Sequence, residues 1–499
     1  MSHTNPPSEH AILKSMRRTG GSYFLIFDRQ LVAREELQVR YDLCVSNALI
    51  VEEQGAWHGG LGVRDGKVVA HFSTPDDAAD RLIDAGGRPL LPGLVDAHVH
   101  FNQPGRTEWE GFSCGSMGAA AGGVTSVIDM PLNNAPSAVD GATLRAKQAA
   151  VRDQSIIDYC FWGGLVTDNV ARLTELDAAG AVAYKAFMSN SGIDDFPAVT
   201  DGVLFDGLRH AARVGALVAV HAESEALTAY FSAQLRAAGR TDRRAWLEAR
   251  PGFSEHEAIS RALLLAGAAG ARLHIVHVST PEGVDLVDAA RRAGQSATCE
   301  TCPHYLVLDE DDFVKIGPAA KCAPPLRPRA SVEGLWQRVL AGQVDLIASD
   351  HSPCPTANKQ RGEQDIWAAW GGITGVQTML PLLLHEGVYR RGMSLALLTR
   401  LTAANPARLF GLYPTKGSLR PGADADFVII DPAEEWTIEA DRLFARHKHT
   451  PFAGRRVRGR VRTTAVRGRI VYEDGAITAP AGYGRSIRKG SEYAYDPSR

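Results

Sequence analysis

The sequence lacks the features that mark membrane proteins, secreted proteins and nucleic-acid-binding proteins. No uninterrupted apolar run approaches the ~18 residues of a membrane span, and residues 1–21 contain no apolar core of a secretion signal. The net charge of −3 leaves no excess of positive charge to attract nucleic acid or anionic lipid. We therefore expect a cytoplasmic protein that acts on a small molecule and binds neither nucleic acid nor membranes.

Cysteine is also scarce. Seven cysteines, an odd number, in 499 residues do not make the framework of a disulfide-stabilised domain. Cys299 and Cys302 have a C-x-x-C spacing, but no second pair stands at zinc-ribbon distance, so a buried strand end is the better interpretation. We expect reduced thiols.

The length of 499 residues exceeds what one hydrophobic core usually supports, so we expect a large domain with a smaller partner. Short alternating strand patterns, broken by glycine and proline, occur on both sides of the central region. We predict an N-terminal extension at 1–40, whose composition makes it a candidate for disorder, and a β-sandwich built jointly from 41–93 and 412–475. A barrel at 94–411 and a C-terminal tail at 476–499 complete the predicted organisation.

In the central region, strand-like and helix-like segments alternate, which is typical of βα units around a parallel sheet. The eight segments expected to be strands are Leu94–His98, Thr125–Met130, Tyr159–Val166, Val182–Phe187, Ala216–His221, Leu273–Val278, Ser296–Cys299 and Asp345–Ser349. They predict an α/β fold, a TIM-type (β/α)8 barrel, with the small β-sandwich beside it.

The most informative segment is Asp96-Ala-His98-Val-His100. Side chains two residues apart leave a strand on the same face, so His98 and His100 can bind one metal ion. Other candidate ligands stand at the ends of later strands, namely Lys185, His221, His277 and Asp350. A lone strand histidine is more often a packed residue, but all these side chains should open on the same barrel mouth. Imidazole and carboxylate suit zinc and its first-row neighbours, so the pattern predicts a hydrolytic centre with two metal ions.

Lys185 needs a specific explanation, because it lies in the apolar segment Val182–Phe187. Burying an unpaired ammonium group is costly. The residue therefore requires a charged partner or a covalent modification.

The order His-x-His, Lys, His, His, Asp at successive strand ends resembles the amidohydrolase superfamily, in the branch of cyclic amidohydrolases. This branch includes dihydroorotases, dihydropyrimidinases (hydantoinases) and allantoinases. The segments that carry the resemblance are Asp96–His100, Pro104–Phe112, Asp129–Asn133, Cys299–Tyr305, Lys321–Pro325, Ser349–Cys354 and Ala369–Gly372. The resemblance extends from about Tyr41 to about Asp474.

This resemblance implies a centre of two divalent metal ions. His98, His100 and Asp350 would bind one ion, and His221 and His277 the other. Lys185 would carry a carboxyl group taken from carbon dioxide and bridge both ions. Zinc is the expected metal, although manganese, cobalt and iron tolerate the same ligands. Asp350 would also be the catalytic residue that carries a proton from the attacking water to the leaving ring nitrogen.

Within this branch the chain is most similar to the allantoinases, which implies ring opening of allantoin to allantoate in purine catabolism. Asn102 stands where dihydroorotases usually have an arginine, and Ala323 stands where dihydropyrimidinase-like enzymes commonly have a serine. A hydantoinase or dihydropyrimidinase activity is the alternative. A more distant alternative is a dihydropyrimidinase-like scaffold protein without metals. It is disfavoured because all six ligand positions are filled.

The resemblance also implies substrate contacts and an assembly. Asn133, Ser352 and the backbone around Cys322 and Gly372 would bind the substrate. Asn133 could equally cap the turn after its strand, because asparagine favours turns. The assembly implied is a homotetramer.

Overall fold

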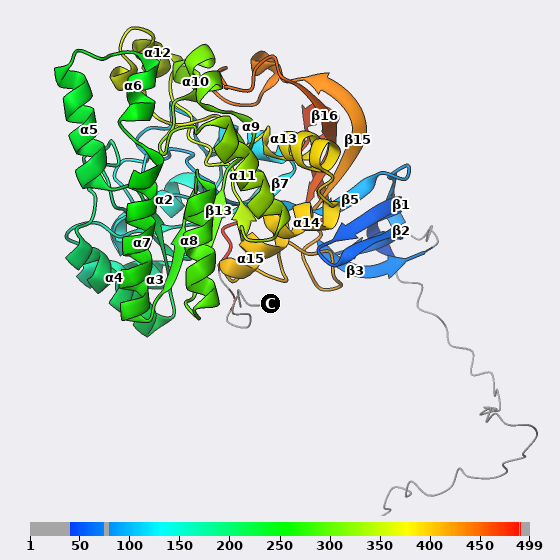
Figure 1. Ribbon diagram of the computed structural model, residues 1–499. Helices are drawn as coiled ribbons and strands as arrows, with labels where there is room; N and C mark the ends of the chain where they lie inside the picture. Colours follow the sequence, from blue (N-terminus) through cyan, green and yellow to red (C-terminus); the bar gives the residue numbers. More distant parts are fainter. Residues whose placement is uncertain (1–39, 74–78, 489, 491–499) are drawn as a thin grey trace, which may run out of the picture. The chain divides into compact units, whose positions relative to one another are not determined.

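Strands and helices alternate through the central region of the computed structural model, which describes residues 40–73, 79–488 and 490 (Figure 1). The residues from 40 onward belong to one compact unit. The extension predicted at 1–40 falls, except for residue 40, outside the described residues. No helix in the described ranges has both the length and the hydropathy needed to cross a bilayer.

Eight strand positions form the predicted barrel, which is confirmed. Parallel pairing joins β6 to β7 and β8 in one sheet and β9 through β14 in another. The two sheets meet at Trp162, whose backbone N–H donates to Asp129 at the end of β7, while Gly163 N donates to Ala183 before β10. A bridge between Val99 and His351 closes the ring. The strands are β6 (Leu94–Val99), β7 (Val124–Asp129), β8 (Asp158–Phe161) with β9 (Gly163–Gly164), β10 (Tyr184–Phe187), β11 (Leu217–His221), β12 (Arg272–Ile275), β13 (Ala297–Thr301) and β14 (Leu346–Ile347).

The helices that follow barrel strands lie on its outside. Local signals in the sequence fix their ends: the Thr280 hydroxyl caps α8 by accepting from Gly283 N, and Gly270 ends α7 in the left-handed region, with φ 64°. These helices are α1 (Phe112–Ala121), α2 (Gly141–Val151), α3 (Leu173–Ala179), α4 (Asp201–Val214), α7 (Gly252–Ala269), α8 (Pro281–Arg292), α11 (Arg329–Leu340), α13 (Met379–Leu383), α14 (Leu395–Thr399) and α15 (Asn405–Leu409).

Further short helices lie in the long loops at the carboxyl ends of the strands, at the top of Figure 1. They are α5 (Glu225–Ala237), α6 (Arg243–Glu248), α9 (Pro303–Val307), α10 (Glu310–Ile316) and α12 (Thr356–Gln360). In barrel enzymes this end carries the catalytic residues.

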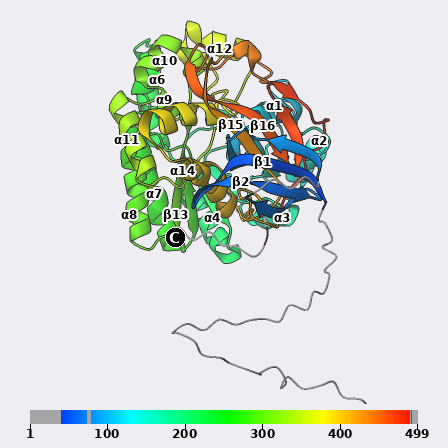
Figure 2. The ribbon, with the colours of Figure 1, turned by 90° about the vertical axis from the view of Figure 1, so that its right-hand side faces the viewer.

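The two terminal segments build one nine-stranded sheet, which confirms the small β-rich domain made from both. Its order is β18-β17-β16-β15-β5-β1-β2-β3, with β4 paired to β1. Figure 2 shows β1 and β2 from the first segment beside β15 and β16 from the second. The strands are β1 (Tyr41–Glu52), β2 (Gly55–Arg64), β3 (Lys67–Phe72), β4 (Ala79–Asp84), β5 (Pro89–Pro92), β15 (Phe427–Thr437), β16 (Arg456–Val466), β17 (Arg469–Glu473) and β18 (Ala476–Ile477).

Hydrogen bonds and apolar packing join the two halves of this sheet. Strand β5 pairs antiparallel with β15, and Leu90 packs in one buried cluster with Phe427 and Ile429. The turn between β2 and β3 has Asp65 and Gly66 both in the left-handed region, with φ 53° and 74°, which suits the twist of a hairpin. The sheet is not wholly antiparallel, because β4 and β5 run parallel to β1.

A buried ionic cluster connects the barrel to the terminal sheet. Lys416 Nζ lies 2.5 Å from Asp158 at the start of β8, and 2.8 Å from both Asp424 and Asp426. The three carboxylates come close enough to hold a cation. The ammonium group of Lys416 supplies that charge, so we interpret the cluster as a structural clamp at the barrel end opposite the carboxyl ends of the strands.

Candidate active site

The six predicted metal ligands converge at the carboxyl ends of the barrel strands. They come from five strands: His98 lies within β6 and His100 directly after it, Lys185 in β10, His221 at the end of β11, His277 after β12 and Asp350 after β14. All six residues are buried, with exposures of 9% or less.

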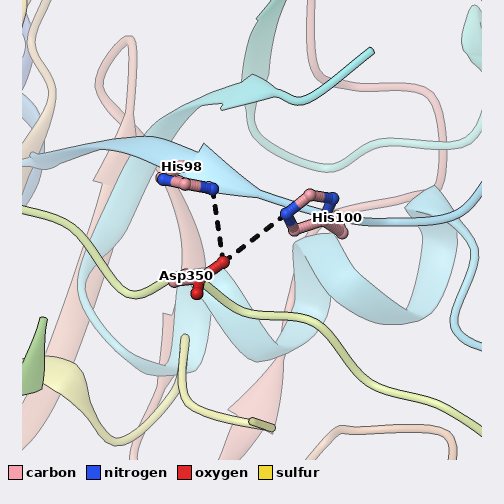
Figure 3. A group of neighbouring side chains, drawn as sticks. All are labelled: His98, His100 and Asp350. Carbon is pink, nitrogen blue, oxygen red and sulfur yellow. Dashed lines mark ion pairs between the residues drawn. The ribbon is translucent and has the colours of Figure 1, made fainter. Parts of the chain in front are cut away.

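His98, His100 and Asp350 form one group (Figure 3). The Nε2 atoms of both histidines face the same carboxylate oxygen, Asp350 Oδ1, at 3.2 Å from His98 and 3.5 Å from His100. One ligand atom from each of the three residues lies within 4.8 Å of the others. Two imidazoles and a carboxylate in this arrangement form a suitable set of donors for a divalent metal ion.

His221 and His277 form a second group beside the first. His221 Nδ1 lies 3.0 Å from His277 Nε2, and the ring centroid of His277 lies 5.5 Å from that of His98. The other nitrogen of His221 contacts Glu223 Oε2 at 2.8 Å, and Arg250 binds the same oxygen at 2.9 Å. A carboxylate on the outer nitrogen orients a metal-binding histidine, so Glu223 leaves His221 Nδ1 directed at His277.

Lys185 lies between the two groups. Its charge interacts with Asp350 on one side and with His221 and His277 on the other. The Nζ atom is buried and makes no hydrogen bond to any residue that the structure describes. Phe187, two residues later, stacks on His221 and lies 4.9 Å from Nζ. Lys185 thus places a buried amine near both groups of metal donors.

The electrostatics of the site favour metal binding. Burial lowers the pKa of the His100, His221 and His277 imidazoles, which keeps them in the neutral form that binds metals. Burial also lowers the pKa of Lys185 to about 8, which favours the free amine. For Asp350 burial acts in the opposite direction, but His98 and His100 outweigh it and hold the pKa of the carboxyl below its usual range.

Backbone strain collects at this site. Asn102, Asn133, His277 and Asp350 have φ values of 62°, 68°, 42° and 46°, in the left-handed region that side chains other than glycine rarely adopt. Such strain costs about 1–3 kcal/mol per residue and persists where the surrounding structure enforces it. It lies here at two predicted metal ligands and at one predicted substrate contact.

The residues fit the metal centre that the sequence predicts. The buried Nζ atom of Lys185 has no hydrogen-bond partner among the described residues, and leaving such an atom unpaired is costly unless something else binds it. The donors are imidazole, carboxylate and a buried amine, the set expected for first-row metals.

The predicted substrate contacts also lie together. Asn133 Nδ2 is 3.4 Å from Ser352 Oγ, two residues after Asp350. A side chain on Gly372 would clash with Ser352, because a Cβ there would lie 2.4 Å from the Ser352 carbonyl oxygen. Gly372 N donates to the carbonyl of Lys321, directly before Cys322. Asn133 therefore faces the site in addition to occupying a left-handed turn position.

A buried lysine ties these loops together. Lys359 Nζ, on α12, donates to the carbonyl oxygens of Lys321, Trp370 and Gly372 at 3.2, 2.8 and 2.6 Å. Its side chain is 4% exposed. The ammonium group of Lys359 therefore contacts both of the segments that carry Cys322 and Gly372.

A cavity of about 520 Å³ opens beside these loops. Its wall includes Ala323 and Gly371, the neighbours of the predicted contacts, and the indole rings of Trp246, Trp367 and Trp370. Arg250, which binds Glu223 behind His221, also lines it. The cavity has room for a small heterocycle, although none of the six predicted metal ligands lines it.

Three residues at the site were missed by sequence reasoning. Glu223 stands two residues after the predicted ligand His221, a position that could have marked it, whereas Lys359 gave no signal because its partners lie 11 to 38 residues away. Glu300 could have been found: it lies between Cys299 and Cys302 in a fully buried strand, where an ionised carboxylate requires a partner. Its Oε1 lies 2.5 Å from Nδ1 of His98.

Comparison with known proteins agrees with this geometry. The profile of the Amidohydrolase family matches residues 90–471. An allantoinase of Rubrobacter xylanophilus is 47% identical over 89% of this chain and 97% of its own length, and one of Solibacter usitatus is 44% identical over 90% and 98%. Among solved structures, an L-hydantoinase (dihydropyrimidinase) from Arthrobacter aurescens superposes with a TM-score of 0.88 at 37% identity, over 90% of this chain and all of that one.

The family profile covers most of the chain, and the relatives match it nearly end to end at well over 30% identity. The barrel and its terminal sheet are those that the resemblance implied. The chain belongs to the amidohydrolase family.

Proposed function

We propose that this chain hydrolyses the ring amide of allantoin to give allantoate, a step of purine catabolism. The observation that carries the proposal is the match to allantoinases, at 44–47% identity over about nine-tenths of the chain. The assembled strand-end site supports it, because it provides the residues that hydrolysis of a cyclic amide requires.

The residues that would hold the metal ions are those of the two groups. His98, His100 and Asp350 would bind one divalent ion, His221 and His277 the other, and Lys185, carboxylated on Nζ, would bridge them. Carboxylation converts a costly buried cation into an anion that two cations can share. Zinc is the proposed metal, with manganese, cobalt or iron as alternatives. Bound metal would supply acidification of water and polarisation of the ring carbonyl.

Asp350 would move the proton. Its Oδ1 faces the site between the two histidines, and its low pKa keeps it ionised and ready to accept a proton from the attacking water. The same oxygen would then deliver the proton to the leaving ring nitrogen, which opens the ring. Burial of the surrounding side chains keeps bulk water away from this transfer.

The loops around Asp350 would orient the substrate. The Asn133 amide and the Ser352 hydroxyl can pair with the polar edges of a hydantoin ring or its ureido arm. Backbone groups around Cys322 and Gly372 would complete the contacts. We further propose that the protein is cytoplasmic and forms a homotetramer.

A hydantoinase or dihydropyrimidinase activity is the second candidate, and the superposition on the Arthrobacter L-hydantoinase is the observation that favours it. One panel decides between them: kcat/KM for allantoin, hydantoin, dihydrouracil and dihydroorotate with metal-loaded protein. We expect allantoin to rank first. Hydantoin or dihydrouracil ranking above it would overturn the proposal.

A further inference from the structure

Behind the first metal group, four side chains form a continuous chain of polar contacts. His98 Nδ1 lies 2.5 Å from Glu300 Oε1. The second oxygen, Glu300 Oε2, lies 3.1 Å from His274 Nε2, and His274 Nδ1 lies 2.8 Å from the hydroxyl of Thr298. His274 and Glu300 are fully buried and Thr298 nearly so, so no bulk solvent competes for these contacts.

The contacts determine where the protons lie. Each oxygen of the Glu300 carboxylate faces one imidazole nitrogen, Nδ1 of His98 or Nε2 of His274. A carboxylate only accepts, so His98 Nδ1 and His274 Nε2 must both carry a proton and donate it. Thr298 can then donate its proton to His274 Nδ1, which leaves every group in the chain paired.

This assignment has a consequence for His98. With the proton on Nδ1, the lone pair of a neutral His98 is on Nε2, the atom that faces Asp350 at 3.2 Å. The opposite tautomer would place a hydrogen where a metal must bind. Glu300 therefore controls whether His98 presents a lone pair or a proton to the centre.

We propose that Glu300, fixed in turn by His274 and Thr298, is the positioning residue that sets the tautomer and ring orientation of His98 and so determines the affinity of the site formed by His98, His100 and Asp350. The inference rests on the metal centre of the proposed function. It predicts an asymmetry between the two ions: the second site has its own carboxylate, Glu223, behind His221. Loss of Glu300 should therefore weaken the binding of the ion held by His98, His100 and Asp350. It should leave the binding of the other ion unchanged.

The test is metal retention, which needs no substrate. Zinc-loaded wild type and Glu300→Gln are mixed with excess chelator, and zinc release is followed over time beside the zinc content per chain. Gln keeps the size of Glu but presents an amide that is not ionised. We expect about one of two ions per chain to leave the variant faster, with its affinity reduced by about 10- to 100-fold.

Two further variants separate this role from a general loss of structure. His274→Phe removes one donor to Glu300. It should accelerate zinc release less than Glu300→Gln does. Glu386→Gln alters a carboxylate that is also buried, at 4% exposure, but pairs with Arg390 and Arg391 on the outside of the barrel. It should release zinc as the wild type does. Thermal unfolding of the metal-free proteins checks that each variant folds.

The outcomes are distinguishable. Zinc release from Glu300→Gln at the wild-type rate would overturn the inference and leave the proposed function intact. If both ions leave Glu300→Gln equally fast, the inference is also overturned. Glu300 would then stabilise the barrel as a whole, without a specific role at His98. A wild type that binds no zinc would instead contradict the metal centre itself.

Discussion

Nε2 of His98 lies 3.2 Å from Oδ1 of Asp350, although one residue belongs to the first strand of the barrel and the other follows the last. The bridge that closes the barrel, between Val99 and His351, joins the residues next to both. Ring closure thus assembles the proposed metal and proton-transfer site, and several consequences can be measured.

Asp350→Asn should abolish turnover. The amide keeps the shape of the side chain but can no longer accept the proton, which should lower kcat by about 10²- to 10⁴-fold. Zinc content per chain, measured beside kcat, shows how much of the loss arises from metal binding. Turnover at the wild-type rate would contradict the role of Asp350 as proton carrier.

Lys185→Ala should also be inactive, because the proposed bridge between the ions is lost. Addition of a short-chain carboxylate such as acetate or propionate should restore part of kcat by taking the place of the carboxylated side chain. Lys185→Arg retains the positive charge but cannot form the carbamate, so it should stay inactive with or without the carboxylate. An active Lys185→Arg variant would exclude the modification.

Removal of metal should abolish activity reversibly. Dialysis against a chelator is expected to leave a folded, inactive protein, and zinc, manganese or cobalt added with bicarbonate should restore turnover. Because Lys185 must be carboxylated again, restoration without bicarbonate and carbon dioxide should be slower. Full activity at less than one metal ion per chain would argue against a binuclear centre.

Lys359→Met should affect substrate binding more than chemistry. The change removes the charged donor to the carbonyls of Lys321, Trp370 and Gly372, and hydrogen bonds to charged groups contribute about 1.5–3 kcal/mol each. We expect KM to rise about tenfold or more, with kcat changed much less. Lys315→Met, at an exposed lysine on α10, is the matched control. A fall in kcat with KM unchanged would show that Lys359 does not position the substrate.

Lys416→Met should destabilise the protein without changing the kinetics of the folded enzyme. The substitution removes the cation that three buried carboxylates share, of which Asp158 keeps Arg467, and breaking a buried pair costs about 3–5 kcal/mol. Lys67 binds Asp424 of the same cluster from a side chain 43% exposed, so Lys67→Met should cost less than about 1 kcal/mol. Chemical denaturation measures the free energy of unfolding of both variants. Equal stability of the two variants would contradict the clamp.

The amino-acid sequence alone predicted the barrel, the terminal β-rich domain and the family. Strand patterns and strand-end positions are local properties: His98 and His100 share a face because they stand two residues apart, and Asp65-Gly66 favours a hairpin wherever it occurs. The family resemblance added the pairing of ligands into two groups, which spacing along the chain could not provide.

Only the tertiary structure showed what surrounds those residues. Glu300 reaches His98, and Lys359 reaches Gly372, through contacts between segments that are neighbours only in the folded barrel. Burial and charge there are collective effects of many segments, so the low pKa of Asp350 has no signature in the residue order. The chain encodes the donors locally, and the closed barrel decides their protonation, orientation and partners, because these depend on distances across the fold.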